Sequence, residues 1–293
     1  MFVSKGMNVS RTALVLGGGG VAGIAWQTGL LHGLAHAGVD VTGPDWSDML
    51  LGTSAGAAVA AQVSSGVSLA DLYDRQVRPE LQIDEPRPNV SIDSLNELLD
   101  AAAERAAGDR QRFARYVGTA ALAASTPSEA ERRAVIAHRL PSHEWPDRDL
   151  RVVAVDAESG RHRVLNRDSG VRLVDAVAAS CAIPGMWPPV TIGVHRYIDG
   201  GVRSSENADL AVGFAKVLIL QVGVVDAGQD PSAAERERLI AGGSSVEVIR
   251  PDADTLSAIG PDPTDPAVRS AAAEAGFRQG SAVSEALRGF KQA

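Results

Sequence analysis

The run of four glycines, Gly17 to Gly20, is the feature that most constrains how this chain can fold. It directly follows the apolar segment Thr12–Leu16, which is typical of a buried strand, and it precedes a segment with helical spacing, Val21–Ala37. Glycine loses more conformational entropy on folding than any other residue, so four in succession are unfavourable unless another group must approach the bare backbone. The sequence therefore predicts a strand, a functional glycine loop and a helix.

Further apolar segments predict that strands and helices alternate along the chain. Strands are expected at 48–51, 151–156, 161–165, 190–198, 216–222 and 246–249, and helices at 57–63, at 171–181 and from Asp265 toward the C-terminus. The segment 216–222 (KVLILQV) is almost wholly apolar, which is typical of a central strand in a parallel sheet. This alternation indicates an α/β fold with a largely parallel sheet covered by helices on both faces.

Residues 67–148 differ from the rest because they are more charged and their pattern is helical. Two capping boxes are expected there, at Ser94–Glu97 and at Thr126–Glu129, the second with proline at the first helical position. The segment Glu85–Asn89 is expected to be a loop. We interpret 67–148 as a helical insertion or cap over the sheet.

Charge and cysteine content exclude several classes of function. The chain has a formal net charge of −8, which argues against a nucleic-acid partner. Its one cysteine, Cys181, cannot form an intrachain disulfide. The first residues lack the apolar core of a signal peptide, and no segment approaches 18 uninterrupted apolar residues. A cytoplasmic location is therefore expected, and the sequence leaves the oligomeric state open.

The segment Gly52–Gly56 (GTSAG) matches the G-x-S-x-G pattern of a nucleophile elbow. In such an elbow a tight turn from strand to helix exposes the serine hydroxyl, here that of Ser54, and the flanking glycines allow the crowded backbone. The following helix would place its positive end near developing negative charge. A plain tight turn with a hydrogen-bonded serine is the alternative.

The glycine loop is open to three interpretations. Gly18, Gly20 and Gly23 match the dinucleotide pattern G-x-G-x-x-G, with Asp40 near the position of a ribose-binding carboxylate. The loop could instead form an oxyanion hole, or be only a tight turn. A phosphate loop is excluded because no G-K-[ST] follows.

A serine nucleophile needs a base, and the sequence offers two candidates. One is His195, the best placed of the six histidines, with Asp168 or Asp175 as its orienting carboxylate. The other is Asp199 in the triplet Asp199-Gly200-Gly201, where a predicted strand gives way to a loop. His32 and His36 lie four residues apart on a predicted helix, but nothing completes a metal site, so packing roles are expected.

The glycine loop, the serine motif and the D-G-G triplet, in this order, resemble the patatin-like phospholipase family. The block Ala179–Gly185 also looks like one that this family carries before its aspartate. The resemblance implies a three-layer α/β/α sandwich with a mostly parallel sheet. It also implies a Ser–Asp dyad with Ser54 as nucleophile and Asp199 as base, and backbone N–H groups of Gly18, Gly19 and Gly20 as the oxyanion hole. The supporting glycines would be Gly23, Gly52, Gly56, Gly200 and Gly201.

The resemblance further implies how the chain is organised and what it acts on. Residues 12–223 would form the catalytic domain, with 67–148 as its insertion shaping an acyl groove, and 224–293 would complete the same domain. The expected partner is a lipid or another acyl ester, with transient contact with a membrane surface, and no cofactor or metal is expected.

One position departs from the family pattern. Ala22 stands where many members have arginine or lysine, so a phospholipid preference is less certain than acyl hydrolysis itself. Arg203 is a candidate for supplying that charge. A Ser–His–Asp esterase, a dinucleotide-binding module and a catalytically silent scaffold remain as alternative hypotheses.

Overall fold

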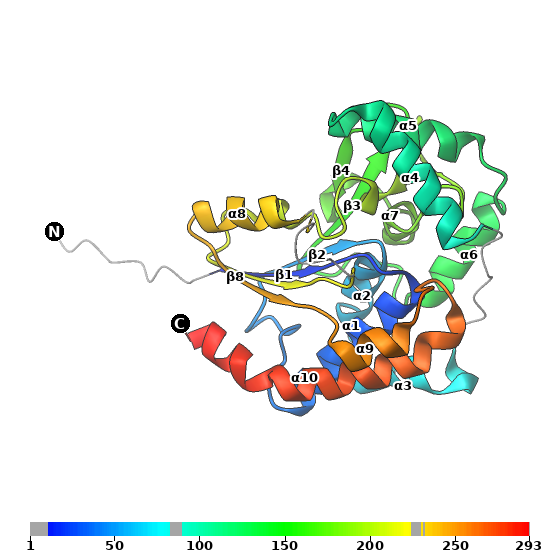
Figure 1. The fold of residues 1–293 in the computed structure, drawn as a ribbon. Coiled ribbons are helices and arrows are strands. Elements are labelled where there is room, and N and C mark those ends of the chain that lie inside the picture. The colour runs from blue at the N-terminus through cyan, green and yellow to red at the C-terminus, as the bar shows by residue number, and fades with distance from the viewer. Residues whose placement is uncertain (1–10, 83–89, 224–229, 231, 293) are drawn as a thin grey trace.

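An eight-stranded sheet crosses the computed structural model, which describes residues 11–82, 90–223, 230 and 232–292 (Figure 1). The strands are β1 (Thr12–Leu16), β2 (Met49–Thr53), β3 (Asp149–Asp156), β4 (His162–Leu165), β5 (Val190–Ile192), β6 (His195–Asp199), β7 (Lys216–Leu220) and β8 (Ser245–Ile249). Their order is β5-β6-β3-β2-β1-β7-β8, and β4 pairs with β3 outside this path. The pairs from β3 to β8 along this order are parallel, whereas β4, β5 and β6 pair antiparallel.

The central strands are apolar throughout because both faces of the sheet are covered. Along β1, Leu14 and Leu16 pack on one face while Ala13 and Val15 pack on the other. The first face contacts helices α1 (Gly20–His36), α2 (Ala55–Val63), α7 (Leu173–Ser180) and α10 (Arg269–Gln292). The opposite face contacts α8 (Ala233–Ala241), which lies across the sheet from α1 and α10 in Figure 1. The prediction of an α/β sandwich with a mostly parallel sheet is confirmed.

The helices within 67–148 lie in three different places. Helix α3 (Leu69–Val77) packs on α1 and α10, and the short η1 (Pro79–Leu81) follows it. Helices α4 (Ile92–Ala106) and α5 (Arg110–Ala123) pack on each other and cover β3 and β6 on the α8 face. Helix α6 (Glu129–Arg139) packs on α7.

Several predicted boundaries are wrong for local reasons. The strand expected at 190–198 is a hairpin of β5 and β6, because Gly193 turns the chain with a φ of 64°. Both capping boxes are misplaced. Ser91 caps α4 by accepting a hydrogen bond from the N–H of Ser94, and Ser128 caps α6 in a box with Glu131. The loop expected at 85–89 lies outside the described residues.

The remaining short elements connect these layers: η2 (Arg167–Ser169), η3 (Gly200–Val202), η4 (Ala208–Ala211), α9 (Ala253–Ile259) and η5 (Pro266–Val268). Among the helices of the described residues, none combines the length and the apolar character needed to cross a bilayer.

Candidate active site

Ser54 lies at the sharp turn between β2 and α2, in a backbone conformation that non-glycine residues rarely adopt. Its φ is 54° and its ψ is −120°. A Cβ atom at Gly56 would lie 1.9 Å from the Leu16 carbonyl oxygen, and one at Gly52 would lie 2.5 Å from the Ala57 Cα. The glycines of the G-x-S-x-G pattern are therefore required by the close approach of β1 and α2, and the turn has the strain expected of a nucleophile elbow.

Two residues at the C-terminal end of α7 hold this turn in place: Ser180 is the last residue of the helix and Cys181 is its C-cap. The N–H of Ser54 donates to Ser180 Oγ at 2.9 Å, and the Ser180 hydroxyl donates to the Val153 carbonyl oxygen at 2.6 Å. Cys181 Sγ donates to the Ser54 carbonyl oxygen at 3.1 Å. Sequence reasoning did not assign Ser180 and Cys181 a role. The one signal for them was the Ala179–Gly185 block.

Asp199 is brought beside Ser54 by the register of the sheet. Thr53 pairs with Val153 across β2 and β3, and Asp199 pairs with Ala154 across β3 and β6. Ser54 directly follows β2 and Asp199 ends β6, and these two strands flank β3. The two residues therefore lie beside each other, on either side of β3. This adjacency depends on the antiparallel pairing of β6, which the sequence did not predict.

The Asp199 carboxyl is buried, with 5% of the residue exposed. Burial raises its pKa to about 7, although hydrogen bonds from the Gly201 N–H and the Ser54 hydroxyl, and the charge of Arg132, act to lower it. The Gly201 N–H donates to Oδ1 at 2.7 Å. Oδ2 has no well-aligned hydrogen bond within the described residues. The Ser54 hydroxyl is thus close to the carboxyl but not ideally aligned with it, as is common in sites without substrate.

The glycine loop differs in one respect from the expected oxyanion hole. The N–H of Gly18 donates to the Ser205 carbonyl oxygen at 2.9 Å and is therefore not free. The N–H groups of Gly19 and Gly20 make no hydrogen bond within the described part of the chain, and neither does that of Ala55 at the start of α2. The N–H of Gly18 is therefore not among the available oxyanion-hole donors.

A cavity of about 30 Å³ lies over Ser54. Its lining comprises Gly20, Val21, Ile24, Ser54, Ala55, Arg132, Arg139, Cys181, Ile183, Trp187 and Thr264. The Arg132 guanidinium stacks 3.8 Å from the centroid of the Trp187 ring, so one wall of this cavity is both aromatic and cationic.

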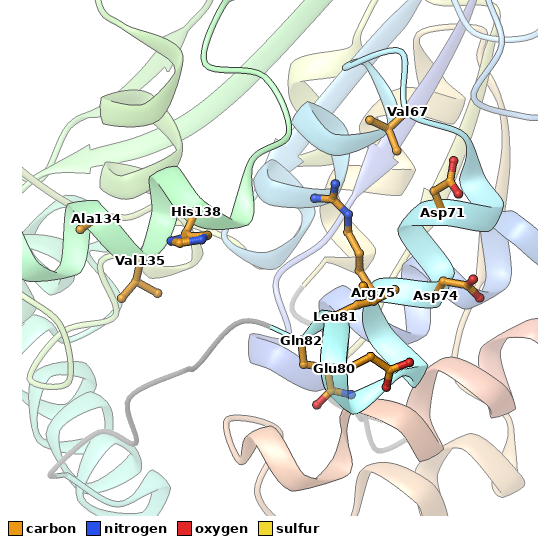
Figure 2. A pocket seen from close by; sticks show the side chains of 10 residues that line it. All are labelled: Val67, Asp71, Asp74, Arg75, Glu80, Leu81, Gln82, Ala134, Val135 and His138. Atoms are coloured by element: carbon orange, nitrogen blue, oxygen red, sulfur yellow. The ribbon is translucent and has the colours of Figure 1, made fainter.

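Two further hollows lie near this cavity. A second cavity of about 40 Å³ shares Val21, Ile24 and Arg139 with the first. It shares Arg75 and Leu81 with a groove of about 910 Å³ between α3 with η1 and α6. Figure 2 shows Arg75 and His138 pointing from the two sides into this groove. Each of the three hollows thus shares lining residues with the next.

His195 is not placed to serve as the base for Ser54. Its Nδ1 pairs with Asp156 Oδ2 at 2.9 Å, and the side chain is 55% exposed. His195 begins β6 and Asp199 ends it, so four residues, or about 13 Å of strand, separate the two. The orienting carboxylates expected for His195 lie elsewhere: Asp175 pairs with Arg133 and Arg172, and Asp168 lies in η2.

Asp40 and Arg203 are also engaged away from the glycine loop. Asp40 follows the C-terminus of α1, a helix of 17 residues that is about 25 Å long, and accepts hydrogen bonds from Thr42. A dinucleotide held at Gly18–Gly23 would therefore lack its ribose carboxylate. Arg203 pairs with Asp209 at 2.6 Å and does not supply the charge missing at Ala22.

The paired histidines of α1 take part in aromatic packing. The ring centroids of His32 and Tyr73 lie 5.1 Å apart, as do those of His32 and Phe277, and His36 lies 5.5 Å from Phe277. Within the described ranges, no group of three histidine, cysteine, aspartate or glutamate side chains has the arrangement of a metal site.

This chain is similar to one protein family and to several solved structures. A model of the patatin-like phospholipase family matches residues 14–212. The solved structures that are similar include VipD from Legionella pneumophila, at 12% identity and a TM-score of 0.48, covering 94% of this chain and 67% of that one. They also include the ExoU–SpcU complex from Pseudomonas aeruginosa, at 18% identity and a TM-score of 0.44, covering 97% of this chain and 52% of that one.

This chain therefore spans about half the length of ExoU. A search of curated proteins returns no significant match.

Proposed function

The chain belongs to the patatin-like phospholipase family, and from that premise we propose that it is a serine acyl hydrolase with Ser54 as nucleophile and Asp199 as base. Membership of this family supports lipid acyl hydrolase activity. The observation that carries the finer assignment is the burial of the Asp199 carboxyl beside Ser54, with a pKa raised to about 7. A base with a pKa near the working pH is well matched to proton transfer.

In the proposed acylation step the Asp199 carboxylate takes the proton of Ser54 Oγ as this oxygen attacks the ester carbonyl carbon. The carbonyl oxygen becomes an anion that accepts hydrogen bonds from the N–H groups of Gly19, Gly20 and Ala55, which have no other acceptor among the described residues. One such donor lowers the barrier by roughly 3 kcal/mol. The ester C–O bond then breaks, and the alcohol leaves with the proton from Asp199.

Deacylation repeats these steps with water as the nucleophile. The carboxylate of Asp199 takes one proton of a water molecule, whose oxygen attacks the acyl carbon of the Ser54 ester. A second oxyanion forms in the same hole, the bond to Ser54 Oγ breaks, and this oxygen recovers the proton from Asp199. The free acid leaves, and the enzyme returns to its starting state.

We further propose that the substrate is an ester with an apolar acyl chain that lies in the hollows leading from Ser54 to the α3–α6 groove. Three of the residues that these hollows share, Val21, Ile24 and Leu81, are apolar, which supports an acyl chain along this path. The other two shared residues, Arg75 and Arg139, are basic. Residues 67–148 contribute both walls of the groove, and residues 224–293 complete the same domain. Substrates of this kind bring the protein into transient contact with a membrane surface.

The test is hydrolysis of p-nitrophenyl esters by the wild type and three variants. Ser54→Ala and Asp199→Asn should each lower kcat/KM by roughly 10³-fold or more, whereas His195→Ala should stay within about threefold of wild type. A fluorophosphonate probe should label the wild type and leave Ser54→Ala unlabelled. Retained activity in Asp199→Asn together with loss in His195→Ala would contradict the dyad and favour a histidine base.

A further inference from the structure

A buried asparagine joins the loop that carries Ser54 to the loop that carries Asp199. Asn207 is 0% exposed and lies just before η4. Its φ of 54° and ψ of 34° are left-handed, a conformation in which asparagine is enriched among non-glycine residues. No sequence motif singled this residue out.

The Asn207 amide donates to oxygen atoms on both loops. Nδ2 lies 3.0 Å from Thr53 Oγ1, next to Ser54, and 3.2 Å from the carbonyl oxygen of Gly200, next to Asp199. It also lies 2.7 Å from the Ser204 carbonyl oxygen. One –NH₂ group thus connects Thr53, the residue before the nucleophile, to Gly200, the residue after the base.

The orientation of this amide is fixed from its other side. Arg203 Nη1 donates to Asn207 Oδ1 at 2.7 Å. The same guanidinium makes a two-pronged ion pair with Asp209, at 2.9 and 2.6 Å. A flipped amide would turn its –NH₂ group toward the guanidinium and its oxygen toward two carbonyl oxygens, so only one orientation satisfies all partners.

The same short segment also holds the glycine loop. The Ser205 carbonyl oxygen accepts the hydrogen bond from Gly18 N–H at 2.9 Å. A Cβ atom at Gly18 would lie 3.4 Å from Ser54 Cβ, so this glycine passes directly beside the nucleophile. Residues 204–207 therefore contact all three pieces of the candidate site.

We propose that Asn207 is the positioning residue that sets Ser54 against Asp199. The inference rests on the function proposed above. Asn207 does not line the cavity over Ser54, and its amide is engaged with Thr53, Gly200, Ser204 and Arg203. It therefore acts on the reaction through the two loops that it joins.

The site needs such a connection because its parts are strained and far apart in the sequence. The positive φ of Ser54 persists only where surrounding contacts enforce it, because a non-glycine residue in this conformation is strained. The Ser54 hydroxyl must also meet a carboxyl held on another strand. A misplacement of about 1 Å costs up to roughly 10²-fold in rate, so a buried hydrogen-bonded bridge between the loops has a direct effect on turnover.

The test uses changes at both ends of the bridge. Asn207→Gly removes the side chain and keeps the left-handed backbone accessible. Thr53→Val removes the acceptor on the elbow while keeping the shape of the side chain, and Thr53→Ser restores the hydroxyl as the matched control. Thermal unfolding of each variant confirms that it is folded at the assay temperature, and Thr53→Val decides the question if Asn207→Gly does not fold.

Two readouts are measured on each folded variant. Asn207→Gly should lower kcat for a p-nitrophenyl ester by about 10–100-fold, Thr53→Val by about 3–10-fold, and both should leave KM within twofold, with Thr53→Ser close to wild type. Hydrogen exchange should become faster in peptides covering 52–56 and 199–203 in Asn207→Gly and Thr53→Val. Wild-type kcat and unchanged exchange in these folded variants would overturn the proposal.

The exchange measurement requires no substrate, so it separates this proposal from the proposed function. If the wild type hydrolyses no ester and reacts with no fluorophosphonate, the proposed function fails. Faster exchange of both peptides in Asn207→Gly and Thr53→Val would then still show that Asn207 connects the two loops. Unchanged exchange would overturn the proposal.

Discussion

The carboxyl group of Asp199 lies in surroundings that favour its neutral form. Burial raises its pKa from 3.8 to about 7, against the opposing effects of two hydrogen bonds and the charge of Arg132. Because the base must be ionised to accept the Ser54 proton, this pKa sets the pH range in which the proposed reaction runs.

We predict that kcat/KM for a neutral ester rises tenfold per pH unit below about pH 7 and levels off above it. At pH 5 the rate should be about one-hundredth of the plateau, because only that fraction of Asp199 is ionised. The measurement is a pH–rate profile from pH 5 to 9 with p-nitrophenyl butyrate. A rate that stays constant down to pH 5 would contradict a buried Asp199 as base.

The same pKa shift makes the stability of the folded protein depend on pH. Between about pH 4 and pH 7 the native state keeps a proton on Asp199 that the unfolded chain has lost, so stability falls as pH rises through this range, by about 4 kcal/mol in total. Asp199→Asn lacks this titration. Its Tm should exceed that of the wild type at pH 8 by more than it does at pH 4.

Helices α3 and α6 form the walls of the groove that we propose as the outer part of the acyl path, and Leu81 in η1 lines both this groove and the second cavity. Leu81 is 46% exposed, so a larger side chain there has room at the surface without overpacking the core. The groove can therefore be narrowed at this junction without a large loss of stability.

We predict that Leu81→Trp lowers kcat/KM at least about fivefold for a long-chain p-nitrophenyl ester and less than about twofold for the butyrate ester, because a bulky ring obstructs only the outer part of a long acyl path. Leu122→Trp is the matched control, since Leu122 is 37% exposed on α5 and lines none of these hollows. Equal losses for both chain lengths would place the acyl chain elsewhere.

Across the whole molecule, the first and last helices of the described chain, α1 and α10, pack on each other (Figure 1). The backbones touch through glycines on both helices. A Cβ atom at Gly33 would lie 2.1 Å from the Phe277 carbonyl oxygen, and one at Gly280 would lie 2.2 Å from that of Leu30. Helix α10 lies beyond the residues matched by the family model, yet it packs on α1, the helix that begins at the end of the glycine loop.

We predict that Gly280→Ala destabilises the protein by about 2 kcal/mol or more, because overpacking outweighs a gain in helix propensity of about 1 kcal/mol. Gly289→Ala is the control on the same helix, where a Cβ atom meets nothing within 4 Å, and should be neutral or stabilising by up to about 1 kcal/mol. Urea unfolding followed by circular dichroism measures both. Equal effects would show that α10 does not pack closely on α1.

The sequence by itself determined the local features of this protein. Steric limits on the backbone act within a few residues, so the glycines around Ser54 were sufficient to indicate a sharp turn from strand to helix. Hydrophobic periodicity is local as well, and the apolar run that forms β7 correctly predicted a strand covered on both faces. The order of three short motifs was enough to indicate the family.

Only the tertiary structure decided which groups lie beside one another. The pairing of β6 with β3 brings Asp199 next to Ser54. The N–H of Gly18 donates to the carbonyl oxygen of Ser205, which is far away in the sequence. Burial of the Asp199 carboxyl, and the bridge that Asn207 makes between two loops, likewise depend on contacts between distant segments. The local pattern limits the conformation of each segment, but the hydrogen-bond partners and the pKa of a group are set by what packs against it.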